Sequence, residues 1–133
     1  MANATETPAG GAAIGAPAVI LRAEGLAVFG VGVIAYSALG ASWWLFGALI
    51  LAPDLSMAGY LAGPRWGALL YNAVHSYVGP AMLGAAAYAL GSSLAGALAL
   101  IWATHIGLDR ALGYGLKYTA GFAFTHLGRI GRS

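Results

Sequence analysis

The stretch WWLFGALILAPDLSMAGYLA, residues 43–62, is almost wholly apolar, yet it places the carboxylate of Asp54 beside Pro53. A transmembrane helix needs about 20 mostly apolar residues to cross roughly 30 Å of hydrocarbon. The stretch has that length and composition, so it predicts a membrane span that carries an ionisable group. An aspartate near the centre of a bilayer costs about 2.5–3.5 kcal/mol, so it persists only where it faces the protein interior and has partners.

The composition of the whole chain is that of an integral membrane protein. Of its 133 residues, 60% are hydrophobic and 8% are charged, whereas a soluble domain averages roughly 25% charged residues. The formal charge of +2 is too small for a nucleic-acid-binding protein, so the expected partner is the lipid bilayer and not a nucleic acid. Because the chain has no cysteine, any metal must be held by nitrogen and oxygen.

Four apolar windows are long enough to be spans: about 18–39, 42–62, 66–90 and 94–116. Short breaks separate them, so consecutive helices are expected to be antiparallel neighbours. The predicted fold class is all-α, an integral membrane up-down four-helix bundle, in which the motif Gly59-x-x-x-Gly63 suits close packing. The expected organisation is a disordered leader at residues 1–17, a four-helix transmembrane domain at 18–117 and a cytoplasmic tail at 118–133.

The cations predict the orientation of this bundle. All six fall on one side of it, and the two opposite loops contain none: Arg22, Arg65, Arg110, Lys117, Arg129 and Arg132. Cytoplasmic loops carry the excess of lysine and arginine, so both termini are predicted to be cytoplasmic. In the tail, Phe122, His126 and Ile130 recur every four residues, which favours a short interfacial helix. A frayed tail is the alternative.

The ionisable groups inside the predicted spans fall in one layer. With a rise of about 1.5 Å per residue, Asp54 lies roughly 13 Å and His75 about 15 Å from the predicted cytoplasmic ends of their helices. The same conversion places Asp109 near 12 Å, His105 near 18 Å and Glu24 roughly 9 Å deep. These groups belong to four different helices, so a common depth lets them meet inside the bundle.

Spacing along the helices agrees with this layer. His105 and Asp109 are four residues apart, so both project from one side of the last helix. Tyr71, Asn72 and His75 share a face of the third helix by the same rule.

Two prolines are expected to expose backbone oxygen at this level. Pro53 has no N–H for the carbonyl of Leu49, and Pro80 has none for that of Ser76. Each proline is therefore predicted to free a carbonyl and to favour a kink.

One interpretation of the layer is a divalent metal site, with zinc as the expected ion. The ligands would be His75, His105, Asp109 and Asp54. A catalytic zinc has three protein ligands and an open position for water, so Asp54 or Glu24 would serve as the catalytic base.

Other polar residues are candidates for supporting roles. Arg110 or Arg65 could hold an anionic group of a substrate. Tyr71 or Asn72 could orient a ligand, and His126 could reach the mouth of the site if the tail folds back.

Two other interpretations of the layer remain open. A structural network would pair Asp54 with His75, and Asp109 with Arg110 or Lys117. A proton or ion path would use the same carboxylates, because ionisable groups inside a membrane commonly mark such paths.

The runs at residues 43–80, 101–122 and 125–131, ending IWATHIGLDRALGYGLKYTAGF and THLGRIG, resemble an uncharacterised bacterial membrane family known as domain of unknown function forty-two sixty. The resemblance covers about residues 20–131. Together with the cation distribution it implies a multi-pass protein of the bacterial inner membrane.

A looser likeness is to the YdjM-type membrane-bound metal-dependent hydrolases. These carry a proline-aspartate motif, a histidine-serine motif, and a histidine and an aspartate four residues apart, which correspond here to Pro53-Asp54, His75-Ser76 and His105-x-x-x-Asp109. The second acid of the first motif is replaced by Ser56. The likeness implies metal-dependent hydrolysis of a lipid-like or phosphorylated substrate.

A membrane-bound metal-dependent hydrolase is therefore the function that the sequence favours. The alternatives are a proton- or ion-conducting protein and an accessory subunit of a larger membrane complex. A homo-oligomer is a further expected assembly, because four short helices enclose little water alone.

Overall fold

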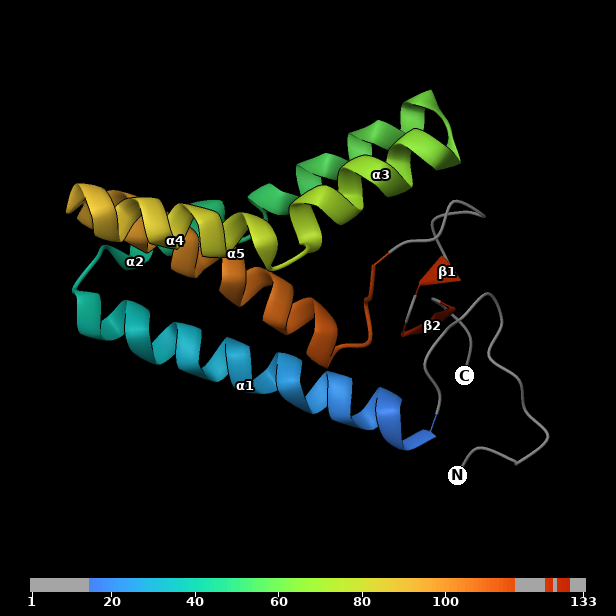
Figure 1. Cartoon of the computed structure of the whole chain (residues 1–133), viewed down its shortest axis with the longest axis horizontal. Helices are drawn as coiled ribbons and strands as arrows, with labels where there is room; N and C mark the ends of the chain where they lie inside the picture. Colours follow the sequence, from blue (N-terminus) through green and yellow to red (C-terminus); the bar gives the residue numbers. More distant parts are fainter. Residues whose placement is uncertain (1–14, 117–123, 126, 130–133) are drawn as a thin grey trace.

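The computed structural model describes residues 15–116, 124–125 and 127–129, and these residues fold mainly as helices (Figure 1). In chain order the elements are α1 (Gly15–Leu39), α2 (Trp43–Leu49), the 3-10 helix η2 (Ala52–Ala62), α3 (Pro64–His75), α4 (Val78–Leu90), α5 (Ser93–Ala111), β1 (Phe124–Thr125) and β2 (Gly128–Arg129). The prediction of a helical fold is confirmed for residues 15–111.

The helices form two groups. α5 lies between α1 and α4 and packs against both, while η2 packs against α3. Figure 1 shows α1 and α5 running side by side, with the η2–α3 hairpin projecting away from them to the upper right. Backbone packing between this hairpin and α5 is sparse. The junction between the two groups is where the candidate site lies.

Two of the four predicted windows contain a break. The window at 42–62 is divided into α2 and η2, and the window at 66–90 is divided into α3 and α4. Ser76 has an extended backbone (φ −91°, ψ 155°), and this ends α3 at His75. Pro80 lies in the first turn of α4, where an amide has no helical acceptor anyway. Pro80 therefore lies at the start of a second helix. The sequence had suggested that it kinks one continuous helix, and that prediction is wrong.

α5 also ends earlier than predicted, at Ala111. Gly113 adopts a positive φ of 91°, which favours glycine, and its amide bonds back to the carbonyl of Arg110 at 3.1 Å. This is the usual way in which a glycine terminates a helix. Arg22 of α1 donates its Nε to the carbonyl of Ala111 at 3.1 Å, so the beginning of α1 is tied to the end of α5.

Glycines allow α1 and α5 to approach closely. A Cβ added at Gly25 would lie 2.4 Å from the Cβ of Arg110, and one added at Gly107 would lie 2.7 Å from the carbonyl oxygen of Gly25. In the predicted Gly59-x-x-x-Gly63 motif, Gly59 packs closely against α3, because an added Cβ would lie 3.2 Å from Leu70 and from the carbonyl oxygen of Trp66. Gly63 has open space around it and a φ of 114°, and it forms the turn between η2 and α3. The close contact between α1 and α5 is therefore made by glycines that the sequence motif did not indicate.

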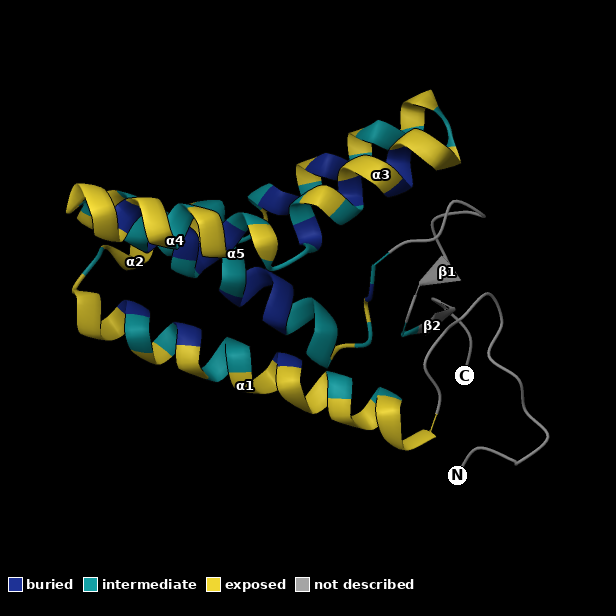
Figure 2. Cartoon of the chain, in the orientation of Figure 1, coloured by how far each residue is buried: buried dark blue, intermediate teal, exposed yellow. Residues whose placement is uncertain are grey.

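Large apolar side chains cover the outside of the helices. Trp44, Leu61, Tyr88 and Leu90 are each at least 80% exposed, and Figure 2 shows that the buried residues of α1 lie on its side facing α5. Two segments, Gly15–Leu39 and Trp43–Ala62, are long and apolar enough to cross a membrane. The second of these is the broken segment formed by α2 and η2.

The described part of the tail is a short strand pair. β1 and β2 are antiparallel, with Phe124 opposite Arg129 and Thr125 opposite Gly128. The predicted interfacial helix is wrong for these residues, because glycine weakens a helix whereas phenylalanine and threonine favour strands. His126, Lys117 and residues 1–14 lie outside the described part of the chain, and the predicted domain limits stay a prediction.

The glycine contact between α1 and α5 predicts a position-specific effect on stability. Gly25→Ala should lower the thermal midpoint in detergent, because overpacking of this kind costs about 1–3 kcal/mol. Gly30→Ala on the same helix is the control, since nothing lies within 4 Å of an added Cβ there and alanine is the better helix former by about 1 kcal/mol. Equal midpoints for the two variants would contradict this packing.

Candidate metal centre

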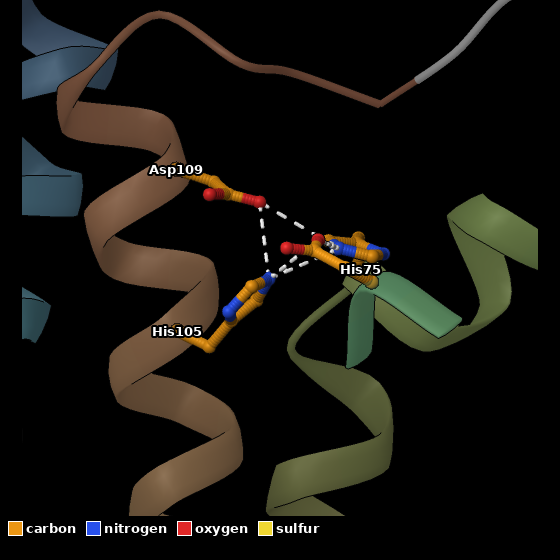
Figure 3. Close-up of side chains that lie close together, drawn as sticks. His75, His105 and Asp109 are labelled. Atoms are coloured by element: carbon orange, nitrogen blue, oxygen red, sulfur yellow. Dashed lines mark hydrogen bonds and ion pairs between the residues drawn. The ribbon is translucent and has the colours of Figure 1, made fainter. Parts of the chain in front are cut away.

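Four side chains from three elements converge at the junction of the two helix groups. Asp54 comes from η2, His75 is the last residue of α3, and His105 and Asp109 lie one turn apart on α5. One ligand atom from each residue can be chosen so that all lie within 4.8 Å of one another. Figure 3 shows His105 and Asp109 pointing from α5 toward His75. The structure thus brings together four of the five ionisable residues that were predicted to meet.

The separations in this four-residue cluster suit a tetrahedral metal. His105 Nε2 lies 3.2 Å from His75 Nε2, 3.1 Å from Asp54 Oδ1 and 3.2 Å from Asp109 Oδ2. His75 Nε2 lies 3.3 Å from Asp54 Oδ1 and 3.6 Å from Asp109 Oδ2. Zinc bonds of about 2.0–2.1 Å in tetrahedral geometry separate neighbouring ligand atoms by about 3.3–3.4 Å. Five of the six edges, at 3.1–3.6 Å, bracket that value, and all four ligand atoms lie within 4.8 Å of one another.

Backbone carbonyls determine which nitrogen of each imidazole carries hydrogen. His75 Nδ1 lies 3.0 Å from the carbonyl oxygen of Tyr71, and His105 Nδ1 lies 2.5 Å from that of Ile50. A carbonyl only accepts hydrogen bonds, so each Nδ1 must donate. In the neutral rings, both Nε2 atoms then present lone pairs to the cluster. Metal-binding histidines characteristically donate their second nitrogen in this way.

The cluster therefore contains four acceptors when both rings are neutral. Two imidazole nitrogens and two carboxylate oxygens face one another, and none of them can donate to another. Buried acceptors that face only acceptors are unfavourable unless a cation or protons lie between them. The donor set of two nitrogens and two oxygens suits zinc and other divalent transition metals.

The break between α2 and η2 supplies one of the supporting carbonyls. The amide of Asp54 bonds to the carbonyl of Leu51 at 3.0 Å, whereas in a continuous α-helix it would bond to that of Ile50. The carbonyl of Ile50 is thereby left for His105. Pro53 was predicted to free the carbonyl of Leu49, and the carbonyl that serves the site is the next one along the chain.

Side chains of α5 also hold the end of α3. Trp102 Nε1 donates to the carbonyl of Val74 at 2.6 Å, and Arg110 Nη2 donates to the carbonyl of His75 at 3.2 Å. The last carbonyls of a helix have no partner within it, so these bonds satisfy groups that the break after His75 exposes. α5 thus provides two members of the cluster and positions a third.

Tyr71 contacts His75 of the cluster. It is buried, and its ring stacks on that of His75 with 3.7 Å between centroids and 6° between planes. The stacking and the hydrogen bond to Nδ1 together hold the imidazole in one orientation. Asn72, on the same helix, is half-buried.

The remaining predicted site residues that the structure describes lie outside the four-residue cluster. Arg110 contacts backbone and the face of Tyr77, 5.2 Å from the ring centroid. Arg65 is exposed at the start of α3, about 15 Å along the helix from His75. Glu24 is exposed on α1 and is not part of the cluster. It precedes the buried Gly25, which faces α5, so its side chain projects from another face of the helix. The structure does not describe His126.

The two halves of the cluster differ in exposure. The His75 and His105 side chains are 3% and 2% exposed, whereas those of Asp54 and Asp109 are 34% and 16% exposed. The cluster is therefore closed on the imidazole side and most open at Asp54, so an incoming group would approach from there.

A family model described as a domain of unknown function, DUF4260, matches residues 18–130. The chain belongs to this family. The match spans all four residues of the cluster. No curated protein and no solved structure matches the chain, and nothing supports the likeness to the YdjM-type hydrolases.

The cluster predicts that a bound cation holds the η2–α3 hairpin against α5. Stripping divalent ions with a chelator should raise amide hydrogen exchange in η2 and α3, because the four acceptors then repel one another across a sparsely packed junction. The α1–α5 contact should keep its protection, which makes it an internal control. His105→Ala should show no response to the chelator. Exchange in the hairpin that is the same with and without metal would contradict this role.

Proposed function

We propose that the protein is a multi-pass membrane protein that binds one divalent metal ion, zinc in the first place, through Asp54, His75, His105 and Asp109. The observation that carries this proposal is the convergence of four acceptor atoms within 4.8 Å of one another, with both imidazoles held in the ligand tautomer by backbone carbonyls.

Surface chemistry supports placing the protein in a bilayer. Many large apolar side chains are exposed on the helices, as is typical of membrane contact, and the charged content of 8% is too low for a water-soluble surface. We place it in the bacterial inner membrane with both termini cytoplasmic. The bond from Arg22 to the carbonyl of Ala111 supports this orientation, because it keeps the beginning of α1 and the end of α5 on the cation-rich side.

The helix breaks favour a functional site over a purely structural network. Irregular backbone at membrane depth is tolerated where it is buried in protein or lines a cavity. Both breaks, at Ile50–Leu51 and at Ser76–Tyr77, lie beside the cluster. The first leaves the carbonyl of Ile50 to accept a hydrogen bond from His105. The second ends α3 at His75, whose carbonyl accepts a hydrogen bond from Arg110. A network that only joined helices would not need to interrupt two of them at the same place.

The activity that this site supports best is metal-dependent hydrolysis of a lipid-like or phosphorylated substrate. A divalent ion held there would supply Lewis-acid chemistry to a phosphoryl or ester oxygen. His75, His105 and Asp109 are the less exposed ligands, so Asp54 is the residue placed to be either a fourth ligand or the proton acceptor for an incoming group.

A proton path is the second candidate, and the same cluster supports it. Two protonated imidazoles paired with two carboxylates would satisfy every acceptor without a metal. Metal content therefore separates the two functions.

Elemental analysis of detergent-purified protein after zinc loading and gel filtration tests the proposal. Wild type should retain about one zinc per chain, and His105→Ala should lose at least about 100-fold in affinity, because it leaves three ligands with one imidazole. Glu24→Gln is the matched control, and it should retain the ion. Wild type that holds no stoichiometric metal would contradict the metal site, and pH-driven proton flux in liposomes would then favour the path.

A further inference from the structure

An apolar groove runs beside the four-residue cluster. Its volume is about 360 Å³, it is open along one side, and its walls come from α2, η2, α3, α4 and α5. Small-molecule sites are typically apolar hollows of about 300–1,000 Å³ with a few convergent polar groups. The four cluster residues do not line the groove themselves, and they are the polar groups that adjoin it along the chain.

The groove and the cluster share the same stretches of backbone. Pro53, Val74 and Ile101 line the groove. Pro53 and Val74 directly precede Asp54 and His75, and Ile101 lies one turn before the next histidine of the cluster. A ligand in the groove would therefore reach the cluster without crossing another helix.

One wall of the groove is held in place by Trp102. Its Nε1 donates to the carbonyl of Val74, and its ring lies against Gly79, where an added Cβ would be 2.4 Å from the indole. The indole is thereby fixed between α3 and α4, so the groove is formed before a ligand enters it.

We propose that this groove binds the single hydrocarbon chain of an amphiphile whose anionic oxygen head group coordinates the ion held by the cluster. The inference rests on the proposed metal site and names the substrate class. A largely apolar wall suits an alkyl chain, and a divalent ion with Arg110 at the same level gives a positive centre for the head group. The open side of the groove lets such a chain enter laterally from the bilayer.

Dodecyl phosphate and Mn²⁺ are suitable probes in neutral maltoside micelles. Mn²⁺ bound in the cluster should strongly relax the ³¹P signal of dodecyl phosphate, because the phosphorus would lie next to the paramagnetic ion. Inorganic phosphate should bind at least about tenfold more weakly, a difference of about 1.4 kcal/mol.

Groove-filling variants separate chain binding from simple partition into the micelle. Leu83→Trp fills the groove from α4 and should weaken dodecyl phosphate binding about tenfold. Met82→Trp, at a 69% exposed position on the same helix, should change it by less than about twofold. Leu98→Trp fills the groove from α5 and should weaken dodecyl phosphate binding as much as Leu83→Trp does. Unchanged Mn²⁺ affinity in every variant would show that the cluster is intact.

Each contrary result has a distinct meaning. If Leu83→Trp and Leu98→Trp behave like Met82→Trp, the chain does not occupy the groove and the inference is overturned while the metal site stands. Equal binding of inorganic phosphate and dodecyl phosphate to wild type would overturn it in the same way. If neither Mn²⁺ nor Zn²⁺ binds, the proposed function fails and the inference fails with it.

Discussion

The structure depends on one electrostatic constraint, the meeting of four acceptor atoms at the junction of two helix groups. His75 and His105 turn their Nε2 atoms toward two carboxylates, and both rings use Nδ1 to reach a carbonyl. In a low-dielectric setting, such an arrangement is costly without positive charge at its centre. A cation there would convert mutual repulsion into the contact that joins the η2–α3 hairpin to α5.

The broken helices follow from the same constraint. Each break removes helical hydrogen bonds, which is unfavourable unless other donors replace them. The replacements are side chains of α5: His105 donates to the carbonyl of Ile50, Trp102 to that of Val74, and Arg110 to that of His75. α5 therefore acts as the common support for both broken segments, and its own continuity from Ser93 to Ala111 gives the site a rigid side.

Much of the candidate site could be predicted from the sequence, because helical rise and the four-residue repeat are fixed by geometry. They brought Asp54, His75 and the His105–Asp109 pair to a common depth. The same method placed Glu24 at that depth but could not fix its face, since the rotation of α1 is set by the glycine contact with α5. The method could not predict the helix breaks at Ile50–Leu51 and Ser76–Tyr77. These breaks depend on hydrogen-bond donors from α5, which is distant in sequence. Pro53 indicated which part of the chain supplies a carbonyl to the site, but it did not identify Ile50 as the residue that provides it.

Zinc X-ray absorption on the metal-loaded, detergent-purified protein measures the proposed coordination directly. The geometry predicts about four nitrogen and oxygen neighbours at about 2.0–2.1 Å, with the multiple scattering of two imidazole rings. A shell of six oxygens with no imidazole contribution would contradict it, because the two histidines would then not be holding the ion.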